Sequence, residues 1–146
     1  MNVTEAWRHS PDRSAPRIHA RIGMLSKPLF FVASAREDLK GFPEDVQDAT
    51  GYALYLAQLG GKHPHAKVLR GFGGAGVLEV IENHAGDTFQ TVYTVQLEHA
   101  IYVLHAFQKK SRRHVETARQ DIDLVRARLR LAEDHHARHF RQGGMS

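Results

Sequence analysis

Three short apolar segments follow one another near the middle of the chain, and only a few polar residues separate them. They cover residues 77–81, 89–95 and 100–107, and β-branched or aromatic side chains dominate each one. A turn signal, Ala-Gly-Asp at residues 85–87, stands between the first two. Because such short connections join antiparallel neighbours, these segments predict an antiparallel meander at the centre of the fold.

The residues before the meander predict a strand and two helices. Residues 29–32 form an apolar run that is typical of a buried strand. Ser34 is expected to cap a short helix that ends near Leu39. Pro43 suits the first position of a second helix, which should end near Leu59, just before two glycines.

A third helix is expected from about Val115. Its apolar side chains recur at helical spacing, at Ile122, Val125, Leu129 and Ala132. The pattern predicts an α+β fold with a small sheet of about four strands, the first strand beside the meander, and helices packed on one face. The other face would stay open to a ligand such as a nucleic acid.

Composition is that of an ordinary globular protein, with 42% apolar and 25% charged residues in a chain of 146. This length suits one domain. We expect no membrane span and no secretory signal, because no long apolar block is present. The absence of cysteine excludes disulfides and thiolate zinc sites, and fits a cytoplasmic protein.

The chain is expected to have three parts. Residues 1–26 lack any period and predict a flexible arm, whereas residues 27–133 form the folded domain and residues 134–146 a basic, His-rich tail. If Met24 is the true start, residues 1–23 are not native. The alternative is a phosphate-binding arm that carries Arg8, Arg13, Arg17 and Arg21.

Positive charge is concentrated in the last part of the chain. The formal net charge is +4, and ten of the twenty Lys and Arg residues follow Gln108, together with only five acidic residues. A localised basic surface suggests an anionic partner, either nucleic acid or an acidic protein. A solvated basic helix face explains the charge equally well.

Two motifs that often bind ligands lack the expected context. The glycine-rich residues 71–76 precede a strand instead of opening a helix, so they predict a flexible hairpin approach and not a phosphate loop. His63 and His65 stand two apart on a loop. His135 and His139 have the spacing of a helical zinc pair, but without an evident third ligand they indicate a solvated helix end, and no metal is predicted.

The segment that favours a specific chemistry is residues 102–111. It carries His105, Phe107, Lys109 and Lys110 to the end of a strand. RNA cleavage by a 2′-hydroxyl needs a base, an acid and cations around the phosphorane, and an aromatic ring can stack an unpaired base. The alternative is that His105 is a hydrogen-bonded core residue.

Several stretches together resemble the phage-derived HigB-like branch of the RelE/ParE toxin superfamily, over residues 27–132. They are residues 67–72, 76–79, 86–89, 92–95, 101–111 and 121–124. The resemblance implies a RelE-like fold and ribosome-associated mRNA cleavage through 2′-hydroxyl attack, with no metal or cofactor. It also implies a helix-turn-helix, HigA-like antitoxin as partner, in a toxin–antitoxin heterotetramer.

With this resemblance, two groups of site residues are predicted. The catalytic candidates are His105, Lys109, Lys110 and Glu79. The RNA-binding candidates are Lys67, Arg70, Gln90, Phe107, Arg112 and Arg113.

The sequence departs from the toxin pattern at position 90. Relatives usually carry Arg there, and the neutral amide of Gln90 cannot replace a guanidinium at a phosphorane. Glu79 stands where ribosome-dependent toxins tend to carry Lys, although the HigB-like branch favours Glu. The chain could therefore be a weak nuclease, or use Glu79 as its base. The alternatives are a ParE-like inhibitor of DNA gyrase and a degenerate, non-catalytic toxin that acts as a binding or regulatory module.

Overall fold

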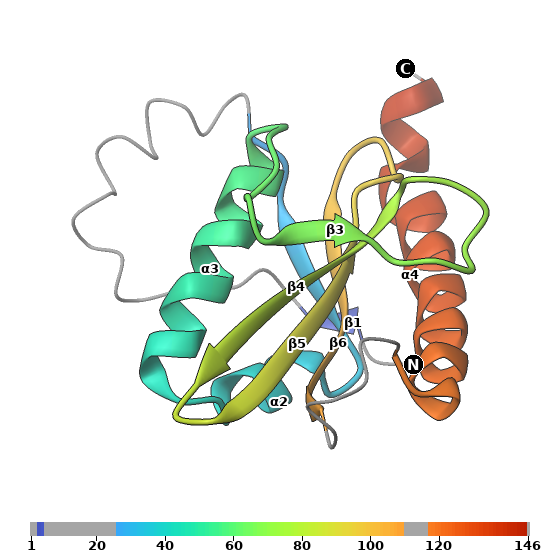
Figure 1. Ribbon diagram of the computed structural model, residues 1–146. Helices are drawn as coiled ribbons and strands as arrows, with labels where there is room; N and C mark the ends of the chain where they lie inside the picture. Colours follow the sequence, from blue (N-terminus) through green and yellow to red (C-terminus); the bar gives the residue numbers. More distant parts are fainter. Residues whose placement is uncertain (1–2, 5–25, 110–116, 146) are drawn as a thin grey trace.

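The structure is a computed structural model that describes residues 3–4, 26–109 and 117–145. Strands and helices combine into one α+β unit, which confirms the predicted fold class (Figure 1). In chain order the elements are β1 (Val3–Thr4), β2 (Leu29–Val32), α2 (Ala35–Lys40), α3 (Glu44–Gln58), β3 (Ala66–Val68), β4 (Val77–His84), β5 (Asp87–Thr94), β6 (Ile101–Lys109) and α4 (Arg119–Met145).

The strands form one sheet in the order β1-β2-β6-β5-β4-β3. Strands β4, β5 and β6 make the predicted antiparallel meander, and β2 joins it in parallel with β6. A two-residue turn links β4 to β5, with φ values of 51° at Ala85 and 89° at Gly86. Positive φ at both positions matches the twist of the hairpin strands. The sequence did not predict the two short outer strands, β1 and β3.

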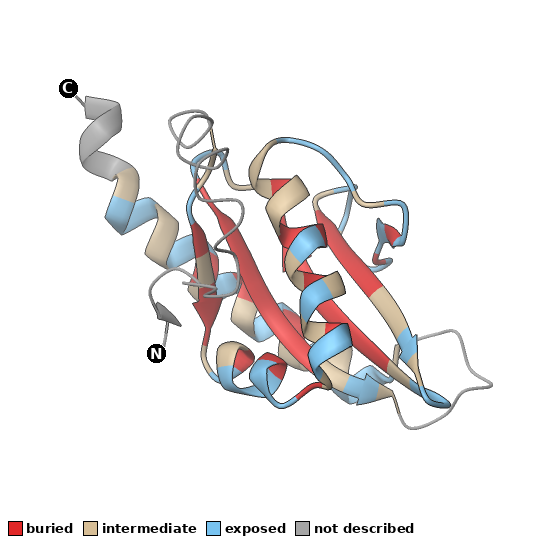
Figure 2. Cartoon of the chain, turned by 90° about the vertical axis from the view of Figure 1, so that its left-hand side faces the viewer, coloured by how far each residue is buried: buried red, intermediate tan, exposed pale blue. Residues whose placement is uncertain are grey.

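Helices cover both faces of the sheet, so the expectation that they share one face is wrong. One buried cluster joins α2 and α3 to side chains such as Phe31 and Tyr93. A second cluster joins α4 to the opposite side, where Val92 and Tyr102 lie. In Figure 1, α3 and α4 stand on opposite sides of the sheet. Figure 2 shows that buried residues run along the strands between these layers.

The helices begin close to their predicted positions. Pro43 precedes α3 as its cap residue, with Glu44 and Asp45 in the first turn, where acidic side chains suit the helix dipole. Ser34 is the N-cap residue of α2, as predicted, but its side chain makes no capping hydrogen bond to the backbone. Its hydroxyl instead donates a hydrogen bond of 2.8 Å to the carboxylate of Asp38.

The amphipathic face predicted for the last helix is confirmed. Val125, Leu129 and Ala132 are buried against the sheet, and Ile122 packs at the edge of the same cluster. The expected start, Val115, lies outside the described residues, as does most of the proposed arm. Helix α4 also runs through the segment predicted as a tail. In the part of the chain that the structure describes, no helix is long and apolar enough to cross a membrane.

Candidate active site

A bulge in β6 determines which side chains reach the α4 face of the sheet. Val92 pairs with His105 and Tyr93 pairs with Val103, which leaves Leu104 without a partner. An extra residue of this kind shifts the alternation of the strand. Leu104 accordingly joins the α4 cluster, while His105 contacts the same helix. The bulge therefore puts His105 on the face that the helix covers.

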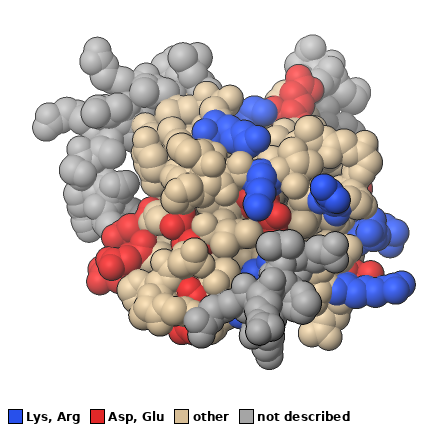
Figure 3. Space-filling view, in the orientation of Figure 1, with Lys and Arg blue, Asp and Glu red and all other residues tan. Residues whose placement is uncertain are grey.

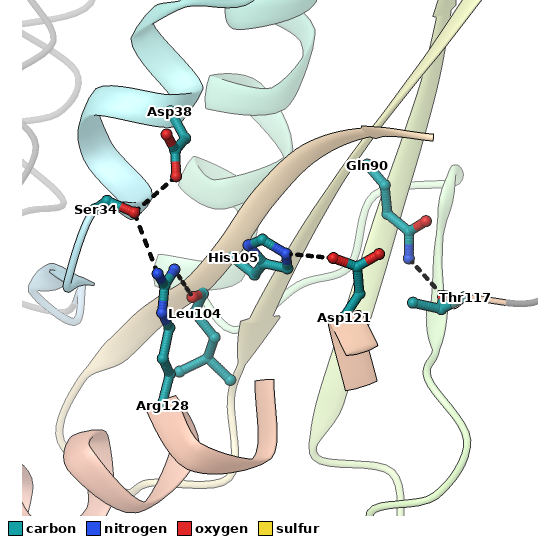
Figure 4. A network of polar contacts seen from close by, with 8 residues as sticks. All are labelled: Ser34, Asp38, Gln90, Leu104, His105, Thr117, Asp121 and Arg128. Carbon is teal, nitrogen blue, oxygen red and sulfur yellow. Dashed lines mark hydrogen bonds and ion pairs between the residues drawn. The ribbon is translucent and has the colours of Figure 1, made fainter. Parts of the chain in front are cut away.

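His105 is held from two sides. Its Nε2 lies 2.9 Å from Oδ1 of Asp121 in the first turn of α4 (Figure 4). Its ring stacks on Phe107, with centroids 4.3 Å apart. Burial lowers the pKa of His105, although the Asp121 carboxylate opposes the shift. A neutral imidazole that donates its Nε2 proton to Asp121 fits this environment.

The other ring nitrogen of His105 is enclosed by the fold. Its Nδ1 is buried, and no described residue offers it a hydrogen bond. In this arrangement His105 acts through the groups it touches, so its geometry is that of a positioning residue beneath Phe107.

A carboxylate on the same face is surrounded by polar groups. Glu79 is 7% exposed, and the fully buried Gln90 donates a hydrogen bond to it through Nε2. The same amide nitrogen donates to the hydroxyl of Thr117 over 3.0 Å. Burial raises the pKa of Glu79, and the charges of Lys109 and Lys67 partly offset this effect. A carboxyl group in this environment is suited to proton transfer.

Six of the predicted site residues share this face of the sheet. Strand alternation and the register of β3 to β6 put them there: Lys67, Glu79, Gln90, His105, Phe107 and Lys109. Lys67 is exposed directly beside Glu79 as its cross-strand partner. Arg70 is exposed after the end of β3. The remaining three predicted residues, Lys110, Arg112 and Arg113, lie outside the described residues.

Sequence reasoning missed the residues that hold the site from the helix side. Asp121 lies four residues before Val125 and therefore on the buried stripe of α4, where a carboxylate needs a partner. The position of Asp121 on the apolar stripe of the helix is the feature of the sequence that could have identified it. Arg128, one of the ten C-terminal cations, donates hydrogen bonds to Leu104 O over 3.0 Å and to Ser34 Oγ over 3.1 Å (Figure 4).

The histidine pair near the end of α4 is not simply solvated, as was expected. His135 packs on Phe30 with ring centroids 5.0 Å apart, and its Nδ1 lies 2.6 Å from the hydroxyl of Tyr102. His139 stacks on His135 and also contacts Phe30. These rings anchor the helix to the sheet and engage one of the nitrogens that a metal would need.

Charge is unevenly distributed around the site. On the face shown in Figure 3, Lys and Arg side chains gather over β3 and α4, whereas a group of acidic side chains lies toward α3. The cations stand on the side of the sheet that carries Lys67 and Lys109. An anionic ligand would therefore be attracted to this face and not to the α3 side.

The fold and the site define a small α+β protein with a cation-flanked carboxylate on one sheet face. Residues 37–130, more than half of the chain, match the family of phage-derived Gp49-like proteins. The chain belongs to this family, which is associated with RelE-like and other toxin-like proteins. No curated protein and no solved structure matches the chain.

Proposed function

We propose that the chain is the toxin of a type II toxin–antitoxin pair and that it cleaves mRNA. The observation that carries the proposal is the arrangement around Glu79, a buried carboxyl group of raised pKa beside two lysines on one sheet face. Cations that can neutralise a phosphate and a group that can exchange a proton are the two requirements of metal-independent RNA cleavage.

In the proposed reaction Glu79 is the base. Its carboxylate takes the proton of the 2′-hydroxyl while that oxygen attacks phosphorus, and the bond to the 5′-oxygen breaks. Lys109 is our candidate for the proton that the leaving 5′-oxygen needs. The products are a 2′,3′-cyclic phosphate and a 5′-hydroxyl. Lys67, exposed beside Glu79, would hold the phosphate.

Phe107 and His105 are assigned to the RNA base. Phe107 is partly exposed, so one face of its ring can stack a nucleobase while the other rests on His105. His105 in turn is fixed by Asp121. We therefore assign His105 to positioning. In the cell we expect ribosome-bound mRNA as substrate, a cytoplasmic location and a helix-turn-helix antitoxin in a heterotetramer.

A non-catalytic binding module is the second candidate, and Gln90 favours it. Its neutral amide is fully buried between Glu79 and Thr117, where it supplies no positive charge to a phosphorane. A protein of this kind would still bind RNA or an acidic antitoxin through its lysines, but it would not cut.

Induced expression with mapping of mRNA 5′ ends tests the proposal. The wild-type chain should arrest growth and create new 5′-hydroxyl ends, and the isosteric variant Glu79→Gln should lose both effects while it keeps its melting temperature. Glu37→Gln, an exposed acid on α2, is the matched control. Cleavage that survives Glu79→Gln would remove Glu79 as the base.

The same experiment separates the alternatives. Growth arrest with intact mRNA and broken DNA would indicate a gyrase inhibitor. RNA binding by the purified protein without arrest or new ends would indicate the binding module. Binding through Lys67 and Lys109 should weaken steeply with salt, because phosphate contacts release counterions.

A further inference from the structure

A second group of polar side chains lies away from Glu79, where the connection after α3 meets β4. His63 and His65 come from the residues just before β3, and Glu82 comes from β4. One ligand atom from each lies within 4.8 Å of the other two. His65 Nδ1 is 3.0 Å from Glu82 Oε2. Three side chains of the types that bind metals, from two segments of the chain, thus lie close together.

Local contacts hold the two imidazoles in place. The backbone N–H of His65 donates a 2.9 Å hydrogen bond to Nδ1 of His63, so the lone pair of this imidazole lies on Nδ1 and a metal ion would take the place of the N–H there. The His63 ring meets His65 edge to face, with centroids 4.9 Å apart, and also meets Tyr52 at 5.8 Å. The two imidazoles are therefore already in contact before any ion binds.

We propose that His63, His65 and Glu82 form a binding site for a divalent transition-metal ion, with Zn²⁺ as the preferred ion. Two imidazoles and one carboxylate suit Zn²⁺, whereas Mg²⁺ and Ca²⁺ prefer oxygen ligands alone. Zn²⁺ takes three protein ligands and a water at about 2.0–2.2 Å. His65 Nδ1 and Glu82 Oε2, 3.0 Å apart, are already close enough to share one ion, and the more distant donors must approach by roughly 1–2 Å.

The site is accessible and separate from the proposed RNA site. The His65 side chain is 59% exposed, so an ion can enter from solvent, and the Glu82 side chain is 15% exposed and anchored in its strand. Glu82 lies two residues after Val80 in β4, so both lie on the face of the sheet that carries the α2 and α3 cluster. Glu79 lies on the opposite face, toward α4. The ion would take no part in the chemistry at Glu79.

The bound ion would stabilise the pairing of the edge strand β3 with β4. Strand β3 pairs with β4 through only three residues, and Lys67 is one of them. His65 lies two residues before Lys67, so an ion that ties His65 to Glu82 fixes the start of this strand. Metal binding would thereby stabilise the fold and hold Lys67 in its position on the opposite face.

Metal titration of the full chain, purified without a polyhistidine tag and freed of metal by a chelator, tests the proposal. Zn²⁺ should bind with heat measurable by calorimetry, and Co²⁺ should give the visible absorption of a four-coordinate ion. Saturating Zn²⁺ should raise the melting temperature by about 5 °C. A tenfold excess of Mg²⁺ should not compete.

Single variants identify the ligands. His63→Ala and the isosteric Glu82→Gln should each weaken Zn²⁺ binding by about tenfold or more and remove the thermal shift. His139→Ala, which removes the other histidine pair, and Asp87→Asn, an exposed acid on the same hairpin, should leave both unchanged. Unchanged binding in His63→Ala and Glu82→Gln, or a loss in His139→Ala alone, would overturn the proposal.

Discussion

His105 and Asp121 join the last strand of the sheet to the first turn of α4, with 2.9 Å between Nε2 and Oδ1. Their side chains are 9% and 22% exposed, so the contact is largely shielded from water. The helix covers Val92 and Tyr102 on the same face. This pair therefore sets where α4 begins over the candidate site.

Removing the carboxylate should loosen that attachment. Asp121→Ala leaves a buried imidazole donor without a partner, so we expect the free energy of unfolding to fall by about 1–3 kcal/mol. Asp121→Asn keeps an acceptor oxygen and should lose about half as much. Urea denaturation measures both. Asp123→Ala, an exposed acid in the same turn, is the control and should change stability by less than about 0.5 kcal/mol.

Stability should fall when the protein is acidified below pH 6.5. Burial is the main cause that lowers the pKa values of His105, His135 and His136 in the folded protein from the ordinary value of 6.5. Below pH 6.5 the unfolded chain therefore binds protons more tightly than the folded chain. The contribution of these histidines to the free energy of unfolding is fully present above pH 6.5 and is lost as the pH falls toward the folded-state pKa values.

Urea denaturation between pH 5 and pH 8 can isolate this effect. The raised pKa of Glu79 acts in the opposite direction, because the folded state holds that proton more tightly, so the comparison is best made in Glu79→Gln. In this background the double variant His135→Gln/His136→Gln should lose stability less steeply with acid. Equal slopes would show that these two histidines do not carry the pH dependence.

The part of the site that the sequence predicted depends on strand alternation. His105, Phe107 and Lys109 occupy every second position, and a single strand therefore presents them on one face. The register with β5 then places Gln90 opposite Phe107. Local periodicity was sufficient here, because the bulge precedes His105 and leaves this alternation intact.

The parts that were missed depend on contacts between distant segments. Residues 101–104 form an unbroken apolar run, which indicates a strand buried on both faces, yet the one-face arrangement was expected. Which helix covers the second face depends on packing that no local pattern specifies. Similarly, β3 has three residues of which two are exposed, so its pairing with β4 leaves almost no trace in the sequence.

A second carboxylate at position 90 should be unfavourable at neutral pH. Gln90 is fully buried and donates a hydrogen bond to Glu79, so Gln90→Glu would put two acids in contact with little change of shape. We expect a loss of about 2–4 kcal/mol at pH 7. The pair should take up a proton at a raised pKa, so stability should recover as the pH falls toward 5.

Stability curves for Gln90→Glu and for Gln108→Glu provide the test. Gln108 is exposed on β6, so its variant adds the same charge without a buried neighbour and should be close to wild type at both pH values. A Gln90→Glu protein that is as stable as wild type at pH 7 would mean that Glu79 already carries a proton there.

Arg128 should stabilise the bulge that places His105. Its two terminal nitrogens donate separately to the carbonyl of Leu104 and to the hydroxyl of Ser34, and thus connect α4, β6 and the start of α2. An ammonium group cannot reproduce this planar fork, so Arg128→Lys should lower the free energy of unfolding by about 1–2 kcal/mol. Arg128→Met should cost about 2–3 kcal/mol, because the Leu104 carbonyl then lacks this partner.

Chemical denaturation of these variants, with Arg130→Lys as a control on the exposed side of α4, measures the difference. Hydrogen exchange at the amides of Leu104 and His105 should quicken in Arg128→Met and stay unchanged in the control. Faster exchange confined to the end of α4 would place the role of Arg128 in the helix and not in the bulge. In that case His105 would depend on Asp121 alone for its position.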